Sequence, residues 1–175
     1  MFKRVRQVAM ALTAKITDTD RDFIDEHLSV PEKALFWDMN LPDQRHALNV
    51  AYTALHLAPR QLSINLEILV KSALLHDVGK IKGDVSTLDK IGTVIAHKIL
   101  GQKVKRWGRP GRGSKLANVR HAVYTYFYHP KRSAELLNSI GEDPLIVEIV
   151  RKHHKAPAES DPPELSLLRK ADNMN

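Results

Sequence analysis

Signals for helix termini recur along this chain, whereas signals for strands do not. Proline or a short polar residue precedes one apolar segment after another, and glycine or proline follows its end. Alternating β-branched runs separated by turn dipeptides are nearly absent. The sequence therefore predicts an all-α domain with six or more helices. The segments expected to be helical are 41–59, 64–77, 86–107, 129–141, 143–154 and 161–174.

Particular residues mark the expected starts of these helices. A proline in the first turn loses no helical hydrogen bond, because the first N–H groups have no partner inside the helix. A serine or aspartate just before the first turn accepts a hydrogen bond from one of those N–H groups. The segment GRPGRGSK (108–115) is expected to be a loop because it contains glycines and a proline. The residues expected at the starts are Pro42, Ser63, Ser86 with Asp89, Pro130, Asp143 and Asp161.

The composition fits one soluble domain over residues 1–175. Of these residues 43% are hydrophobic, which is enough for one buried core. The apolar stretch near the N-terminus is short and contains Lys15, so we expect neither a signal peptide nor a membrane span, and we expect a cytoplasmic location. There is no cysteine, so a transition metal would have to be held by histidine and carboxylate side chains.

Positive charge is concentrated in one part of the chain. The formal net charge is +7, and residues 90–134 contain eleven lysines and arginines and no acidic residue. Such a segment favours a phosphate-rich substrate, an anionic lipid surface or a nucleic acid as partner. We expect an anionic partner at residues 98–120, within a basic insertion of about residues 84–128. The other interpretation is a solvated charged face, with Trp107 and the nearby tyrosines in the core.

The stretch ALLHDVGKIKGD (73–84) places two metal-binding residue types where an apolar helix is expected to end. His76 and Asp77 lie in the last turn, and Ser72 and Ala73 one turn earlier are small enough to leave room for an ion. An imidazole and a carboxylate suit Mn, Fe, Zn, Co or Ni, and a carboxylate can bridge two ions. A surface salt bridge is the other interpretation of this pair.

Further histidine and aspartate positions strengthen the metal-site interpretation. His153 continues the apolar stripe of its helix, whereas His154 is rotated by about 100°. Proline disfavours helical geometry in the residue before it, so His129 is expected beside a helix N-terminus that begins at Pro130. A hydrogen-bonded histidine in the core is the other interpretation of each histidine. The remaining candidates, in the first turn of one helix and at the edge of the last, are His46 and Asp172.

The order of these residues, with Gly79 and Lys80 following the His-Asp pair, resembles the HD-domain superfamily of metal-dependent phosphohydrolases over residues 42–173. The match is closest to the HDIG and HD-GYP-like branch, and it implies an HD-domain helical bundle. It also implies a phosphorylated small-molecule substrate such as a nucleotide, and two divalent transition-metal ions, Fe or Mn first, with Zn, Ni, Co or Mg as alternatives. The ligands that the resemblance implies are His46, His76, Asp77 and Asp172 for the first ion, and Asp77, His129, His153 and, as an alternative, His154 for the second.

The sequence departs from the HD-GYP pattern in three places. The GYP tripeptide is absent, and Pro42 stands where some trinuclear members carry an acid four residues before the first histidine. The segment between His76 and His129 is also longer than in HD-GYP proteins, because it contains the basic insertion. These departures favour two ions over three, and cyclic-di-GMP specificity is not inferred.

The resemblance implies hydrolysis of phosphate esters. Two ions bridged by Asp77 would lower the pKa of a shared water and so provide a metal-bridged hydroxide. Lys80 would contact the phosphate or that water, and a helix N-terminus at Pro130 would direct its amide groups to the same place. The expected function is therefore a binuclear phosphodiesterase acting on a nucleotide or cyclic dinucleotide. The alternatives are a mononuclear nucleotidase or nucleotide-polyphosphate hydrolase, and a non-catalytic helical signalling module.

Overall fold

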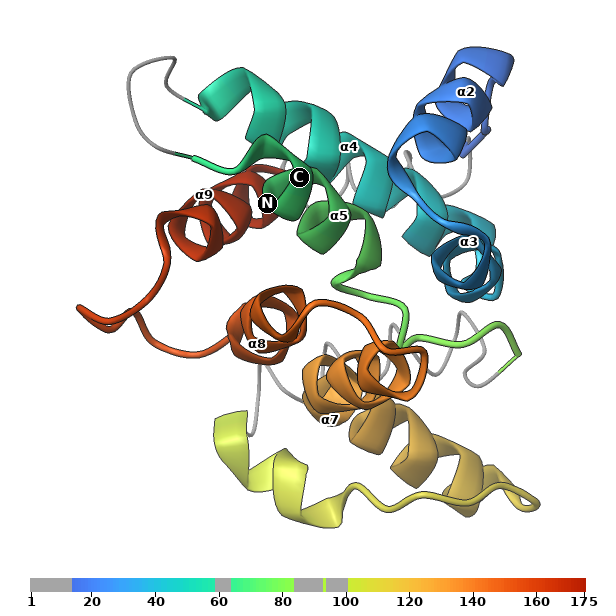
Figure 1. Cartoon of the computed structure of the whole chain (residues 1–175). Helices are drawn as coiled ribbons and strands as arrows, with labels where there is room; N and C mark the ends of the chain where they lie inside the picture. The colour runs from blue at the N-terminus through green and yellow to red at the C-terminus, as the bar shows by residue number, and fades with distance from the viewer. Residues whose placement is uncertain (1–13, 59–63, 84–92, 94–100) are drawn as a thin grey trace.

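The protein is built from helices, as a computed structural model that describes residues 14–58, 64–83, 93 and 101–175 shows (Figure 1). These residues form seven α-helices and one 3-10 helix, and the extended backbone among them pairs at one isolated bridge, Met39 with Ile81. The all-α prediction is confirmed. The helices are α2 (Asp18–His27), α3 (Val30–Trp37), α4 (Leu41–Leu57), α5 (Leu66–Leu75), η1 (Gly101–Trp107), α7 (Lys115–Ser139), α8 (Pro144–Lys152) and α9 (Pro163–Met174).

The helices pack in two groups that share one hydrophobic core. In the first group α4 packs against α5 and α9; in the second, α7 packs against α8 and η1. α5 contacts α8 and so joins the groups, with α4 at the top of Figure 1 and η1 at the bottom. Burying one large apolar side chain stabilises a fold by about 1.5–3 kcal/mol, so this core holds the helices in place. Its fully buried side chains include Phe36, Leu48, Leu74, Leu137, Ile149 and Leu168.

Two of the expected helix starts are confirmed, at Pro42 and Asp143, and two are wrong, at Asp161 and Pro130. Pro42 lies in the first turn of α4, and the Asp143 side chain caps α8 by accepting a backbone N–H at 2.7 Å. Asp161 does not cap α9, because Pro162 is the N-cap residue. Prolines at the start of a helix have no N–H that a cap could satisfy. The Asp161 carboxylate pairs instead with Arg169 at 2.7 Å.

The start of α5 differs from the expectation by a few residues. Asn65 caps this helix, because its side chain accepts a hydrogen bond from the Ile68 N–H at 3.2 Å. Ser63 lies outside the described residues, as do residues 84–92 and 94–100. The helix expected over 86–107 is therefore described only at residue 93 and from Gly101 onward, where the chain forms η1. Among the described helices, none combines the length and the apolar character needed to cross a bilayer.

The largest correction concerns Pro130. α7 runs without interruption from Lys115 to Ser139, so no helix begins at Pro130 and no N-terminal amide groups are available there. A proline inside a helix lacks an N–H and leaves the carbonyl four residues earlier without its usual donor. That carbonyl belongs to Tyr126, and it accepts a hydrogen bond from Nδ1 of His129 at 2.8 Å. The side chain next to the proline therefore replaces the missing donor.

Candidate metal centre

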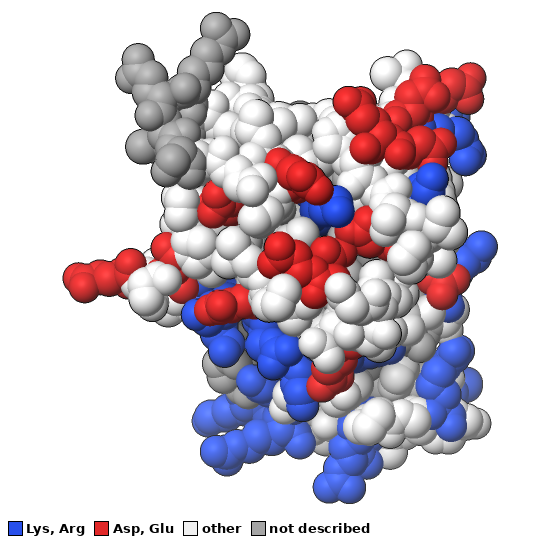
Figure 2. Space-filling view, in the orientation of Figure 1, with Lys and Arg blue, Asp and Glu red and all other residues white. Residues whose placement is uncertain are grey.

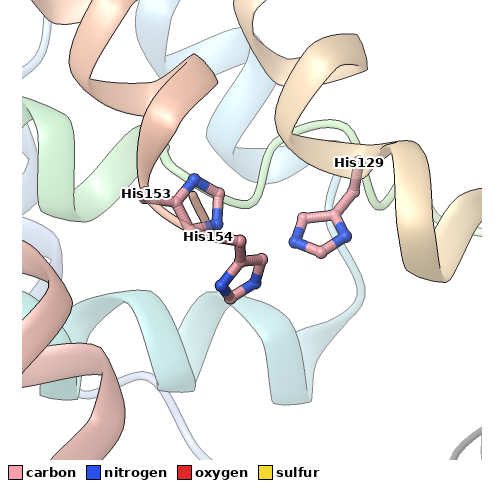
Figure 3. Close-up of side chains that lie close together, drawn as sticks. All are labelled: His129, His153 and His154. Atoms are coloured by element: carbon pink, nitrogen blue, oxygen red, sulfur yellow. The ribbon is translucent and has the colours of Figure 1, made fainter. Parts of the chain in front are cut away.

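The side chains singled out in the sequence meet where α5 and α8 end, against α4, α7 and α9. His76 is the C-cap residue of α5 and His153 is that of α8, so both side chains project from a point where the backbone turns. Figure 3 shows His129 on α7 directed toward His153 and His154 at the end of α8. The whole cluster consists of His46 of α4, His76, Asp77 and Lys80 at the end of α5, His129 of α7, His153 and His154 at the end of α8, and Asp172 of α9.

Asp77 lies at the centre of this cluster, with 1% of its side chain exposed. Its Oδ2 is 3.4 Å from Nε2 of His76, and its Oδ1 is 3.3 Å from Nε2 of His129. The Oδ1 contact does not have hydrogen-bond geometry, and Oδ1 has no hydrogen-bond partner within the described residues. The two oxygens of one carboxylate thus face histidines from two different helices.

The backbone holds three of the histidines in the same way. Nδ1 of His76, His129 and His153 each donates to the carbonyl three residues earlier, at 2.8, 2.8 and 2.6 Å. In a neutral ring, a donating Nδ1–H leaves the lone pair on Nε2. All three Nε2 atoms are buried, and none has a hydrogen-bond partner in the part of the chain that is described. Because a buried acceptor without a partner costs about 1–3 kcal/mol, this orientation favours a cation at the Nε2 atoms.

Asp172 lies between the two most exposed histidines of the cluster. Its Oδ1 is 3.0 Å from Nε2 of His46, and its Oδ2 is 4.0 Å from Nδ1 of His154. The exposed fraction of the side chain is 28% for His46 and 52% for His154, against 1% for His76. The cluster is therefore buried around Asp77 and open to solvent near Asp172.

Burial and charge act in opposite directions on the central pair. Burial lowers the pKa of His76, but the adjacent Asp77 carboxylate outweighs it and raises that pKa to about 9. Burial raises the pKa of Asp77, but Lys80 and His76 outweigh it and hold that pKa well below its usual value. Without a metal ion, His76 is therefore protonated at pH 7 and Asp77 is ionised.

His129, His153 and His154 are neutral at pH 7. Burial and the Lys80 ammonium lower the pKa of His129 to about 3. Burial, together with the charge on His76, lowers the pKa of His153 well below its usual value, and burial also lowers the pKa of His154. A neutral imidazole is the form that binds a metal ion. These residues are thus in a binding-competent form before an ion arrives.

Lys80 lies beside Asp77 on the partly exposed side of the cluster. Its Nζ donates to Oδ2 of Asp77 at 2.5 Å, and 24% of its side chain is exposed. Burial lowers the pKa of Lys80, but Asp77 and Asp43 outweigh it and raise that pKa, so the ammonium stays charged. The sequence led us to expect a contact with phosphate or water; in the structure the ammonium holds one oxygen of Asp77.

Ser133 positions α7 against the cluster, and the sequence did not indicate it. The Gly79 N–H donates to Oγ of this buried serine at 2.8 Å. Gly79 approaches α7 so closely that a Cβ in its place would lie 2.6 Å from the carbonyl oxygen of His129. The one sequence signal is the four-residue spacing from His129 to Ser133, which places both on one helix face. That signal has meaning only if the helix continues through Pro130.

The donor atoms fit divalent transition-metal ions. Atoms bound to one ion at about 2.0–2.2 Å lie about 2.8–3.6 Å apart, which is the separation found on either side of Asp77. Imidazole nitrogen and carboxylate oxygen suit Fe, Mn, Zn, Co and Ni. The residues around Asp77 could therefore hold divalent transition-metal ions. The groups whose donor atoms all lie within 4.8 Å of one another are His46–His76–Asp172, His76–Asp77–His153 and His129–His153–His154.

The fold and the cluster together define a helical domain with a histidine- and aspartate-lined site suited to divalent metals. The profile of the HD domain matches residues 44–175, and the chain belongs to this family. The HD domain implies the superfamily of metal-dependent phosphohydrolases, so the predicted superfamily is confirmed. The matched range contains every residue of the cluster. Searches of curated proteins and of solved structures found no match.

Proposed function

We propose that this protein is a binuclear metal-dependent phosphodiesterase of the HDIG and HD-GYP-like branch that acts on a nucleotide or cyclic dinucleotide. The position of Asp77 carries the proposal, because one of its oxygens faces His76 at 3.4 Å and the other faces His129 at 3.3 Å. A carboxylate in this position can bind two ions at once. Two ions held there, Fe or Mn first, would supply an activated water and would neutralise the phosphoryl oxygens of the substrate.

The ligand assignment follows the three groups of donor atoms. Asp77 is assigned to both ions, and His153 is assigned to the second ion although it also forms a group with His76 and Asp77. His154 is half exposed and is assigned as a further ligand of the second ion. The first ion is assigned to His46, His76, Asp77 and Asp172, and the second to Asp77, His129, His153 and His154.

The remaining contacts prepare the site for an anionic substrate. The Nδ1–H bonds of three histidines to backbone carbonyls orient each Nε2 toward Asp77 before binding. Lys80 fixes Oδ2 of Asp77 and adds positive charge where a phosphoryl-transfer transition state gathers negative charge. A phosphate enters from the solvent-exposed side, near His46 and His154.

A mononuclear nucleotidase or nucleotide-polyphosphate hydrolase is the second candidate. His46, His76 and Asp172 form a group of donor atoms on the exposed side that could hold one ion without the others. In that case Nε2 of His129 and Oδ1 of Asp77 would stay buried without a hydrogen-bond partner among the described residues. Such atoms are costly, and this favours two ions. A non-catalytic signalling module is disfavoured because the first-ion ligand set is complete.

Metal content and turnover test the proposal together. Protein purified without chelator is expected to carry two ions per chain, and His129→Ala is expected to lower this toward one. Turnover of the best substrate from a panel of phosphomonoesters, linear dinucleotides and cyclic dinucleotides should fall about 10²–10³-fold, because a catalytic ion contributes several kcal/mol. His46→Ala should impair the first ion and abolish activity.

His56→Ala is the matched control, because His56 is an exposed histidine on α4, ten residues beyond His46. It should change neither metal content nor turnover. If His129→Ala keeps both ions and wild-type turnover, the binuclear assignment is wrong and the mononuclear candidate moves ahead. Folded wild-type protein that takes up neither Mn nor Fe(II) would remove the enzymatic proposal altogether.

A further inference from the structure

A second surface with a distinct chemistry lies at the end of the molecule formed by η1, the loop 108–114 and the first turn of α7. Every charged residue within 101–120 is lysine or arginine. Figure 2 shows Lys and Arg gathered over this end, whereas most Asp and Glu lie over the other half of the same face. We call this surface the basic end. Its exposed cations, none of which pairs with an acidic side chain of the described residues, are Lys103, Lys105, Arg106, Arg109, Arg112 and Lys115.

Aromatic side chains lie among these charges. Trp107, the last residue of η1, is 42% exposed. Tyr124 and Tyr128 stack one turn apart on α7 with ring centroids 5.0 Å apart, and Nζ of Lys105 lies 5.2 Å from the centroid of the Tyr128 ring. Cations that bind phosphates, with an exposed aromatic ring between them, are the features with which proteins bind single strands.

We propose that the basic end binds single-stranded nucleic acid, with the cations contacting phosphates and the Trp107 indole stacking on a base. The cations belong to three successive segments, so they suit a ligand with repeated phosphates better than a single phosphate group. A membrane surface is disfavoured, because its binding scales with inserted apolar area. Within the described part of the basic end, the exposed large apolar side chains are Trp107 and Leu116. This inference does not depend on the proposed hydrolytic activity.

The wild-type protein provides the first test. Anisotropy of a fluorescein-labelled oligo(dT) of about 20 nucleotides is measured against metal-free protein in EDTA, so that hydrolysis plays no part. If four to six phosphates are neutralised, log K should fall with log salt with a slope of about −3 to −4. The salt range of about 50–200 mM covers the change.

Charge reversal locates the binding surface. Lys105→Glu with Arg106→Glu and Arg109→Glu should weaken binding at least about tenfold and make the slope shallower by about 2, at about 0.7 per lost phosphate contact. The matched control is the triple variant Arg151→Glu, Lys155→Glu and Lys170→Glu. These three exposed cations lie on α8, in the turn after α8 and on α9. The control has the same net charge as the first variant and should keep the wild-type slope.

Trp107→Ala separates stacking from charge. It should weaken binding about fivefold or more while leaving the salt slope unchanged, because a base contact is lost and no phosphate contact is. The proposal is overturned if wild-type protein does not bind the oligonucleotide at the lowest salt, or if both triple variants lose affinity equally. Tighter binding to phosphatidylserine vesicles than to the oligonucleotide also overturns it and assigns the surface to lipid.

Discussion

Replacing Gly79 by alanine tests how closely α7 must approach the turn that carries Asp77. Gly79 does not have a positive φ, so alanine is compatible with its backbone conformation. The added Cβ would lie 2.6 Å from the carbonyl oxygen of His129 and 2.8 Å from the backbone N of Ser133. Both contacts are with backbone atoms, so a side-chain rotation cannot relieve them. Either α7 or the turn must move.

The size of the movement follows from these distances. Ordinary van der Waals contact begins at 3.4 Å, so the shortest contact requires a shift of 3.4 − 2.6 = 0.8 Å. A metal site tolerates changes in ligand distance of about 0.2 Å, and His129 lies on the segment that is displaced. We expect the second ion to bind about 10–100-fold more weakly. Overpacking should also lower the free energy of unfolding by about 1–3 kcal/mol.

Two measurements separate these effects. Calorimetric titration of metal-free protein gives the affinity for each ion, and urea unfolding of the metal-free protein gives the stability. Leu137→Ala is the matched control, because Leu137 is fully buried on the same helix, one turn beyond Ser133. Leu137→Ala should lower the free energy of unfolding by about 2–5 kcal/mol. Because it creates a cavity rather than a clash, both ions should bind as in wild type.

The reasoning is refuted if Gly79→Ala binds both ions with wild-type affinity and has wild-type stability. It is also refuted if Leu137→Ala loses the second ion to the same degree, because general destabilisation would then explain the loss. A drop in stability without loss of the ion would show that the clash is relieved without displacing the ligands of the second ion.

Two further predictions concern pH. Metal binding at pH 7 should release about one proton from His76, because this histidine has a pKa of about 9 and must lose its proton to bind an ion. The apparent metal affinity should therefore rise with pH up to about pH 9. Calorimetry in two buffers of different ionisation enthalpy counts the released protons, and a count of zero would contradict the prediction. The second prediction concerns Asp20, which pairs with Arg45 at 2.7 Å and accepts a hydrogen bond from Tyr52 at 2.9 Å. Burial raises the pKa of Asp20, but these bonds outweigh it and hold that pKa below its usual value. The contribution of ionised Asp20 to stability is therefore present above about pH 4 and is lost as pH falls. Asp20→Asn should lower the free energy of unfolding by about 1–3 kcal/mol at pH 7. In urea unfolding, the difference from wild type should shrink toward low pH, and a constant difference would contradict the prediction.

Local sequence patterns were sufficient to predict the class of fold, and together with the resemblance to the HD domain they singled out the residues of the cluster. Helix periodicity and helix ends depend on contacts within about four residues, so Pro42 and Asp143 could be assigned from their neighbours alone. The His-Asp pair at positions 76 and 77 was recognisable for the same reason, since it ends an apolar helix. Residue type and order then identified the family, whose profile covers residues 44–175.

Pro130 shows where local patterns fail. A proline inside a helix costs about 3 kcal/mol, so the sequence favours a helix start there. In the structure, the His129 side chain satisfies the carbonyl that the proline leaves without a donor. Gly79 packs against the same turn, and Ala134 and Leu137 on the next turns are buried in the core. Tertiary packing and one side-chain hydrogen bond therefore keep α7 continuous.

The tertiary structure alone decided which atoms of the cluster face one another. His46 and Asp172 are 126 positions apart in the chain, and their side chains are 3.0 Å apart in the fold. The sequence left open whether His153 or His154 points inward. In the structure His153 is buried, and His154 is half exposed at the solvent-exposed side of the cluster. Both histidines have a donor atom within 4.8 Å of a donor atom of His129. Local propensities act within a few residues, whereas the direction of these side chains depends on how five helix segments pack around one shared core. That packing brings one oxygen of Asp77 to each of two histidine groups.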